Sequence, residues 1–157
     1  MTRATTRHTA DSLLGGALRL LQPRTGYRVN IDSLLLVAFA GERRVERLVD
    51  LGSGVGALGL LALHRGLARR ALLIDSDPAL VALAERNLKQ VGATGEARRL
   101  DLRSEKLAET AVPLVLCNPP YYPPTSHRPA RDPSRSLSRS GELRPFLAAA
   151  SSALSRK

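Results

Sequence analysis

The residues best suited to chemistry in this chain of 157 residues stand behind a short apolar run, Leu114–Cys117. The run predicts a strand buried on both faces, and it stops abruptly at Asn118–Tyr122, which reads Asn-Pro-Pro-Tyr-Tyr. Prolines cannot extend a strand ladder, and they hold the backbone rigid just past its end. The Asn118 amide and the nearby carbonyls then form a stiff cluster of hydrogen-bond acceptors beside flat rings. Such a cluster suits a planar NH2 group carried on a ring or an amide.

A second group of such residues is rich in glycine. Gly52, Gly54 and Gly56 follow a predicted strand, Arg47–Leu51, and precede an apolar helical run, Leu60–His64. Strand, glycine-rich turn and helix form the first unit of a nucleotide-binding α/β sheet. Glycine is needed where the chain reverses tightly or a ligand touches the backbone. The helix that follows points its N–H groups back at such a ligand.

Acidic residues mark the same edge of the predicted sheet. Asp50, Asp75 and Asp101 each stand at the end of a predicted strand, and Asn118 follows the fourth. The carboxyl ends of parallel strands lie together, and open α/β sheets bind ligands there. We therefore expect one ligand site that contains all four side chains.

The elements that must position these residues alternate along the chain. Apolar periodicity and glycine or proline punctuation predict an α/β fold with a parallel sheet and helices on both faces. Residues 1–12 are expected to be loose, and residues 12–21 fit either a short helix or a strand pair. Asp32 and Asp77 are the expected N-caps of two helices. The predicted strands are 47–51, 69–75, 97–100 and 114–117, and the predicted helices are 33–40, 60–64, 79–91, 104–111 and 142–154.

Two motifs together resemble those of S-adenosylmethionine-dependent methyltransferases that modify exocyclic or amide nitrogens. They are Asp50-x-Gly52-x-Gly54-x-Gly56 and the Asn-Pro-Pro-Tyr string that begins at Asn118. The segment Gly26–Ala40 resembles the one that precedes the cofactor domain in bacterial tRNA (adenine-N6) methyltransferases, where it lies over the cofactor pocket. The resemblance implies a Rossmann-like class I methyltransferase fold with S-adenosyl-L-methionine as cofactor and S-adenosyl-L-homocysteine as product.

The resemblance also implies residue roles. Asp50 would lie near the aminoacyl end of the cofactor, Asp75 on its ribose and Asp101 beside its adenine. Asp32 is either a helix cap or a more distant cofactor contact. The implied cofactor-binding residues are Asp50, Gly52, Gly54, Gly56, Asp75, Asp101 and Asn118, and the implied catalytic residues are Asn118, Pro119 and Tyr121.

Charge and composition favour an RNA partner. The chain has 24 Lys and Arg against 14 Asp and Glu, a net charge of +10, with 21 arginines and 3 lysines. Arginine pairs with phosphate and stacks on bases, although a general bias towards Arg and Ala gives the same numbers. With the resemblance, this charge favours tRNA as the partner.

Other features bear on the location of the protein and on metal binding. A single cysteine, Cys117, fits a reducing compartment and a buried structural thiol. No apolar run reaches transmembrane length, so we expect a cytoplasmic protein without membrane contact. His8 and His64 have no metal-ligand spacing, and we expect no metal site.

The chain departs from the family pattern in two places. The related tRNA enzymes carry an Ala-Arg-His-Glu-like string where this chain has Leu137–Ser140, within a Pro/Ser/Arg-rich stretch at 123–140 that is either a substrate flap or disordered. The resemblance implies seven strands, of which about four are present. We therefore divide the chain into a basic N-terminal segment, 1–25, and an incomplete methyltransferase domain, 26–157. Its open sheet edge predicts self-association.

Several alternatives remain at this point. Gly54-x-Gly56-x-x-Gly59 followed by Asp75 also fits a dinucleotide oxidoreductase, although Asp50 would repel a pyrophosphate. The Asn-Pro-Pro string is shared by glutamine-N5 methyltransferases of release factors, and guanine-N2 methylation of ribosomal RNA is a further possibility. A non-catalytic cofactor-binding or RNA-binding remnant, or a plain turn after the strand, would need no chemistry.

Overall fold

The computed structural model describes residues 8–25, 28–119 and 143–154. Its centre is a sheet of four parallel strands in the order β5-β4-β3-β6. The bounds are β3 Val45–Leu51, β4 Ala68–Asp75, β5 Gly95–Arg99 and β6 Leu114–Cys117. The chain runs outward from β3 to β5 and then returns to place β6 on the opposite side of β3. This reversal of strand order is where open α/β sheets hold their ligands.

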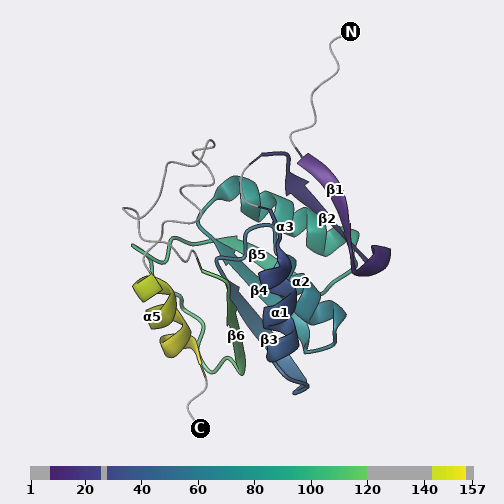
Figure 1. Ribbon diagram of the computed structural model, residues 1–157. Helices are drawn as coiled ribbons and strands as arrows, with labels where there is room; N and C mark the ends of the chain where they lie inside the picture. Colours follow the sequence, from purple (N-terminus) through teal and green to yellow (C-terminus); the bar gives the residue numbers. More distant parts are fainter. Residues whose placement is uncertain (1–7, 26–27, 120–142, 155–157) are drawn as a thin grey trace.

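Helices cover both faces of the sheet, as predicted (Figure 1). Leu48 of β3 faces a core formed with α1, α2 and α3, whereas Val49 and Leu51 face a second core formed with α5. The side chains of a strand alternate between faces, so a run of apolar residues fills both cores. No helix in the described ranges is long and apolar enough to cross a membrane. The helices are α1 Ile31–Phe39, α2 Ala57–His64, α3 Pro78–Gln90 and α5 Leu143–Ala153.

An antiparallel hairpin precedes the sheet. It consists of β1 His8–Leu13 and β2 Leu18–Pro23, joined through a 3-10 turn. The ambiguous segment 12–21 is therefore part of a strand pair, and residues 8–12 are not loose as expected. Leu18 and Leu20 are 2% and 0% exposed and belong to the core shared with α2 and α3. The predicted division after residue 25 is thus not a division of the hydrophobic core.

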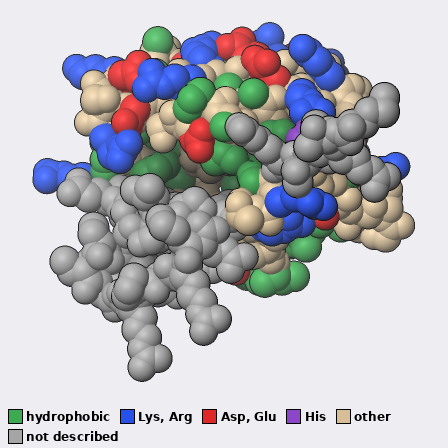
Figure 2. Space-filling view, turned by 90° about the horizontal axis from the view of Figure 1, so that it is seen from above, with side chains coloured by type: hydrophobic (Ala, Val, Ile, Leu, Met, Phe, Trp, Pro, Cys, Tyr) green, Lys and Arg blue, Asp and Glu red, His purple; other side chains and the backbone are tan. Residues whose placement is uncertain are grey.

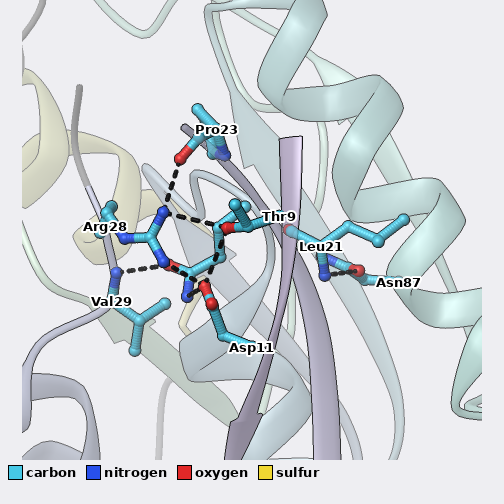
Figure 3. A network of polar contacts seen from close by, with 8 residues as sticks. Thr9, Asp11, Leu21, Pro23, Arg28, Val29 and Asn87 are labelled. Carbon is cyan, nitrogen blue, oxygen red and sulfur yellow. Dashed lines mark hydrogen bonds and ion pairs between the residues drawn. The ribbon is translucent and has the colours of Figure 1, made fainter. Parts of the chain in front are cut away.

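A polar network ties this hairpin to the segment that leads into α1 (Figure 3). The Arg28 guanidinium donates to the Pro23 carbonyl at 2.9 Å and pairs with the Asp11 carboxylate. Gln22, 3% exposed, donates to Asp11 at 2.6 Å and accepts from the Val29 N–H at 2.8 Å. The path of the chain into α1 is fixed by these bonds.

One predicted helix cap is confirmed and one is wrong. The Asp77 carboxylate accepts from the Ala79 N–H at 2.8 Å and caps α3. Asp32 is not the cap of α1, because Asn30 holds that position and its Oδ1 accepts from the Asp32 N–H at 3.2 Å. Both Asn and Asp cap helices well, so only the observed start of α1 separates them.

The predicted helix at 104–111 is wrong, because the structure has turns and extended chain there. Leu107 and Val112 are 8% and 0% exposed and pack into the α5-side core. Ala111 has a φ of 53°, in the left-handed region that ends any helix before β6. Tertiary packing of two apolar side chains overrides a weak local propensity here.

Candidate functional site

Strand register brings the predicted site residues to one edge. Leu51 pairs with Cys117, so Gly52 and Asn118 leave neighbouring strands at the same level. Asp75 is the last residue of β4. Asp101 follows β5, whose exit is held beside β4 by a 2.9 Å bond from the Leu100 N–H to the Asp75 carbonyl. Asp75, Asp101 and Asn118 thus follow the carboxyl ends of parallel strands in one sheet, and a ligand site shared by them stays a prediction.

Asp50 is completely buried beneath this edge, at 0% exposure. Its Oδ2 accepts from the Gly59 N–H at 2.8 Å, in the first turn of α2. Its Oδ1 is also buried and has no hydrogen-bond partner in the described part of the chain. The pKa of Asp50 is raised to about 7, chiefly by burial; the Gly59 bond opposes this rise and the nearby Asp75 charge adds to it. Asp50 thus supports the start of α2, and one oxygen remains unpaired.

Asp75 is held by backbone amides on both sides. Oδ2 accepts from the Gly54 N–H at 2.7 Å, and Oδ1 accepts from the Asp77 N–H at 2.9 Å. Burial raises the pKa of Asp75, while both amide bonds act in the opposite direction. Each carboxylate oxygen can accept more than one bond, so Asp75 can still receive two hydroxyl donors.

The three loop glycines have different surroundings, although all have positive φ (69°, 56° and 84°). A Cβ at Gly52 would stand 2.9 Å from Phe146 of α5, and one at Gly56 would stand 2.7 Å from Leu73. Among residues 8–25, 28–119 and 143–154, a Cβ at Gly54 would meet nothing within 4 Å. Gly52 and Gly56 are therefore required by packing, and Gly54 is the position where a ligand can approach the backbone.

Asp101 differs from the other two acids. Its carboxylate accepts two bonds from the Arg103 guanidinium, both at 2.8 Å. The Arg103 side chain holds the pKa of Asp101 well below its usual range, at about 2. The Asp101 carboxylate thus lies in an ion pair, and its place beside an adenine stays a prediction.

Asn118 lies against α1. Its Nδ2 donates to the Ser33 hydroxyl at 3.4 Å, and Ser33 is 4% exposed. Cys117, directly before it, has its pKa raised to about 12 by burial and by the Asp50 charge, which fits a structural thiol. Pro119 follows Asn118 at the same edge, whereas Tyr121 and the stretch 123–140 with its Leu137–Ser140 string lie outside the described residues.

Sequence reasoning missed three residues at this edge. Ser33 contacts Asn118, Phe146 packs on Gly52, and Asn87 donates to the Val55 carbonyl within the glycine loop. None stands at a strand end or in a motif. Asn87 interrupts the apolar pattern of α3 and is nevertheless 0% exposed, and only this exception to amphipathicity could have drawn attention to it.

Two hollows of the surface lie away from this edge. One, of about 790 Å³, lies between the hairpin and the ends of α2 and α3; the other, of about 540 Å³, lies on α1 and is lined by Asp32, Leu35, Leu36 and Phe39. Neither is lined by Asp50, Asp75 or Asp101. Across the described ranges, no group of three His, Cys, Asp or Glu side chains could hold a metal ion.

Comparison of the chain with protein-family models agrees with the strand order, the glycine loop and the acids. Residues 26–144 match the model of the Methyltransferase small domain. The chain belongs to this family. Its predicted Rossmann-like fold is confirmed, and the Asn-Pro-Pro-Tyr string and the glycine loop both fall inside the matched range.

Relatives in the Methyltransferase small family include RNA-modifying enzymes. The chain is 30% identical over 107 residues to the tRNA1(Val) (adenine(37)-N6)-methyltransferase of Pasteurella multocida, covering 64% of this chain and 44% of that protein. It is 29% identical over 135 residues to the ribosomal RNA large subunit methyltransferase G of Pseudoalteromonas atlantica, covering 74% and 34%. The chain thus spans less than half the length of these relatives.

A solved structure of an RNA methyltransferase has a similar fold. The 16S rRNA N2 G1207 methyltransferase of Thermus thermophilus, in complex with AdoMet and guanosine, superposes with a TM-score of 0.57 at 25% identity. The superposition covers 74% of this chain and 33% of that one. The family and the fold are therefore consistent at the level of sequence and of structure.

Proposed function

We propose that this chain forms the cofactor and acceptor site of an S-adenosyl-L-methionine-dependent N-methyltransferase that acts on adenine N6 of a tRNA. The observation that carries the proposal is Gly54. Its N–H is bonded to Asp75, and in the described part of the chain no atom lies within 4 Å of the place where a Cβ would stand. A ligand placed there touches backbone on one side and a fixed carboxylate on the other.

The residues around Gly54 fit this cofactor. Asp75 has acceptor capacity for two ribose hydroxyls, and its orientation is set by two amides rather than by solvent. One buried oxygen of Asp50 has no hydrogen-bond partner among the described residues, which suits a cationic ammonium reached directly or through water. When bound, the cofactor supplies an electrophilic methyl group on sulfur. The protein contributes a fixed carboxylate, an accessible backbone and a nearby acceptor for an amine.

The acceptor nitrogen would be held by Asn118 and Pro119. The Asn118 side-chain oxygen and the Pro119 carbonyl can each accept one N–H bond of an NH2 group. Drawing both N–H bonds into acceptors localises the nitrogen lone pair and aims it at the methyl group, so that orientation and electrostatics provide the catalysis. Tyr121 would stack on the base, a contact worth roughly 1–3 kcal/mol. A base in folded RNA must be splayed out to reach it.

Adenine in tRNA is favoured because several relatives of this chain are named tRNA1(Val) (adenine(37)-N6)-methyltransferase. Charge alone does not mark an RNA surface. Figure 2 shows Lys and Arg side chains spread around the upper face with acidic side chains among them, and Arg98 and Arg103 are paired with carboxylates. A cytoplasmic location fits this substrate and the single cysteine.

Guanine-N2 methylation of ribosomal RNA is the second candidate. It is favoured by the superposition on an rRNA enzyme that holds guanosine and by the similarity to a large-subunit rRNA enzyme. Both candidates use the same amine geometry at Asn118.

The test is methyl transfer from labelled S-adenosylmethionine to unmodified tRNA, to rRNA and to a release-factor peptide containing glutamine. We expect label in tRNA adenine, and loss of transfer in Asn118→Ala while S-adenosylhomocysteine still binds. Ser33→Ala is the matched control, because it removes the 3.4 Å contact with Asn118 but keeps the amide. Label in the peptide or in guanine would contradict adenine as the substrate and assign glutamine or guanine instead. Cofactor binding without any transfer would support a non-catalytic remnant.

We further propose that a second copy of the chain covers the open side of the sheet. In the described residues β6 pairs only with β3 and lies between α1 and α5 (Figure 1). Exposed apolar side chains follow both helices at helical spacing: Ile31, Leu35 and Phe39, at 61%, 50% and 88%, and Leu143 and Leu147, at 48% and 60%. Antiparallel pairing of two β6 edges would place like helices together. Sedimentation should show a dimer that Phe39→Glu dissociates; a monomer at high concentration would contradict it.

A further inference from the structure

We propose that Asn87 is a positioning residue through which the N-terminal hairpin holds the glycine loop in its ligand-binding shape. The inference rests on the proposed cofactor site and adds a residue and an element that the motifs do not contain. Asn87 lies on α3, outside both the loop and the hairpin.

The contacts of Asn87 join three elements. Its Oδ1 accepts from the Leu21 N–H of β2 at 2.7 Å. Its Nδ2 donates to the Leu21 carbonyl at 3.0 Å and to the Val55 carbonyl at 2.9 Å. Figure 3 shows the Asn87 side chain reaching from α3 to the β2 backbone at Leu21. With 0% exposure, both N–H bonds of the amide are used, one on each element.

The Val55 carbonyl lies in the part of the loop where the backbone has the most conformational freedom. Val55 stands between Gly54 and Gly56, whose φ values are 56° and 84°. Glycine reaches positive and negative φ with similar ease, so the sequence alone does not fix the peptide planes of this loop. The Asn87 bond holds the carbonyl end of the peptide plane between Val55 and Gly56, and the N–H end of that plane donates to the Ser53 carbonyl at 2.8 Å. The Gly54 N–H, one residue earlier, then meets Asp75 at 2.7 Å.

The hairpin supplies the other half of the support. Two of the three hydrogen bonds of the Asn87 amide go to Leu21, which pairs with Ala10 in the hairpin ladder. A second bond from α3 to the hairpin, from Gln90 to the Arg19 carbonyl at 3.1 Å, is exposed and does not contact the loop. The amide of Asn87 is therefore oriented by the hairpin, and its remaining N–H is directed at Val55.

A purely structural buried asparagine would look similar in one respect. Any buried amide needs partners, and their loss lowers stability. The positioning role differs because it predicts weaker cofactor binding beyond the loss of stability. It also predicts that cofactor binding and hairpin order strengthen each other, since coupling between two sites is reciprocal.

The experiment compares three variants of the whole chain by calorimetric titration with S-adenosylhomocysteine, well below the unfolding temperature of each. Asn87→Ala should weaken binding about 10-fold, the effect of one lost hydrogen bond. Gln90→Ala, which breaks only the hairpin bond, should change it less than about 2-fold. Val112→Ala removes buried packing on the α5 side of the sheet, outside the hairpin, and serves as the destabilised control. Equal weakening in Asn87→Ala and Val112→Ala, or none in Asn87→Ala, would overturn the proposal.

Amide hydrogen exchange tests the same coupling in the unaltered chain. S-Adenosylhomocysteine should slow exchange of the Leu21 N–H, which is bonded to Asn87, together with the Gly54 and Gly56 N–H groups. Slowing in the loop without any change at Leu21 would contradict the coupling. If S-adenosylhomocysteine does not bind at all, the proposed function fails separately. The ligand-free exchange of the Gly56 N–H then decides, since Asn87→Ala should accelerate it more than Val112→Ala does.

Discussion

Asp75 and Asp101 stand at the ends of neighbouring parallel strands, yet the structure treats them in opposite ways. Asp75 is held by two backbone amides, at 2.7 and 2.9 Å, and burial raises its pKa. Asp101 accepts two bonds from the Arg103 guanidinium and one from the Arg103 backbone N–H at 3.1 Å, and these bonds lower its pKa to about 2. The same position along a strand therefore produces a fixed, partly desolvated acceptor in one case and a surface ion pair in the other.

The comparison shows what a strand-end acid needs in order to serve as a ligand site. Backbone amides cannot leave, so they orient Asp75 and keep its remaining lone pairs directed at the same place. An exposed arginine neutralises Asp101 and competes with any ligand for its oxygens, and Arg103 is 67% exposed. The cofactor site should therefore depend strongly on the Asp50 and Asp75 side and weakly on Asp101.

The largest expected effect concerns Asp50 and pH. Its pKa is raised from 3.8 to about 7, so the folded chain holds a proton that the unfolded chain releases. Stability from this group is complete below pH 3.8 and is lost as pH rises to about 7, by about 4 kcal/mol. Asp50→Asn should remove most of this decline in urea unfolding measured across that range. A decline of equal size in the variant would contradict the origin in Asp50.

The next effect concerns the glycines that support the same side. Gly56→Ala places a Cβ 2.7 Å from Leu73 at a φ of 84° and should lower stability by about 3 kcal/mol. Gly54→Ala meets nothing within 4 Å and should lower it by only about 1 kcal/mol. Titrations with S-adenosylhomocysteine give the loss of affinity, and we take its ratio to the loss of stability. This ratio should be larger for Gly54→Ala than for Gly56→Ala, because the new methyl group at residue 54 enters the ligand space. Equal ratios for the two variants would contradict the open position at Gly54.

The smallest effects belong to Asp101. Arg103→Ala frees the carboxylate and should strengthen binding of S-adenosylhomocysteine by about 3-fold if Asp101 receives an adenine amino group, while Asp101→Asn should weaken it by a similar factor. Because the Asp101 pKa is lowered, its contribution to stability is present above pH 3.8 and is lost as pH falls towards 2, opposite in sign to Asp50. Titration of both variants with S-adenosylhomocysteine tests this. If neither variant changes the affinity, Asp101 is not part of the cofactor site.

Much of this arrangement was predictable because it is local. Buried apolar runs gave β3, β4 and β6 within two residues, and the Asp77 cap of α3 followed from the proline after it. The alternation of strands and helices predicted the parallel sheet and the edge where the acids meet. Each of these features depends on neighbours in sequence.

The rest depends on contacts between distant residues. Asn87 bonds Leu21, 66 residues away, and Ser33 meets Asn118, 85 residues away. The path of the chain at 104–111 follows the packing of Leu107 and Val112 into the α5-side core. The Arg103–Asp101 pair is local, two residues apart, yet nothing at a strand end marks it in the sequence. The roles proposed for Asp50, Pro119 and Tyr121 towards ligands stay predictions.

The most direct test of the central claim is calorimetric titration of the chain with S-adenosylhomocysteine, beside an Asp75→Ala variant. The account predicts micromolar binding by the chain and a loss of about 100-fold in the variant, as expected when acceptors for two hydroxyls are removed. Binding that survives unchanged in the variant, or no binding by a folded chain, would contradict a cofactor site built on Asp75 and the glycine loop.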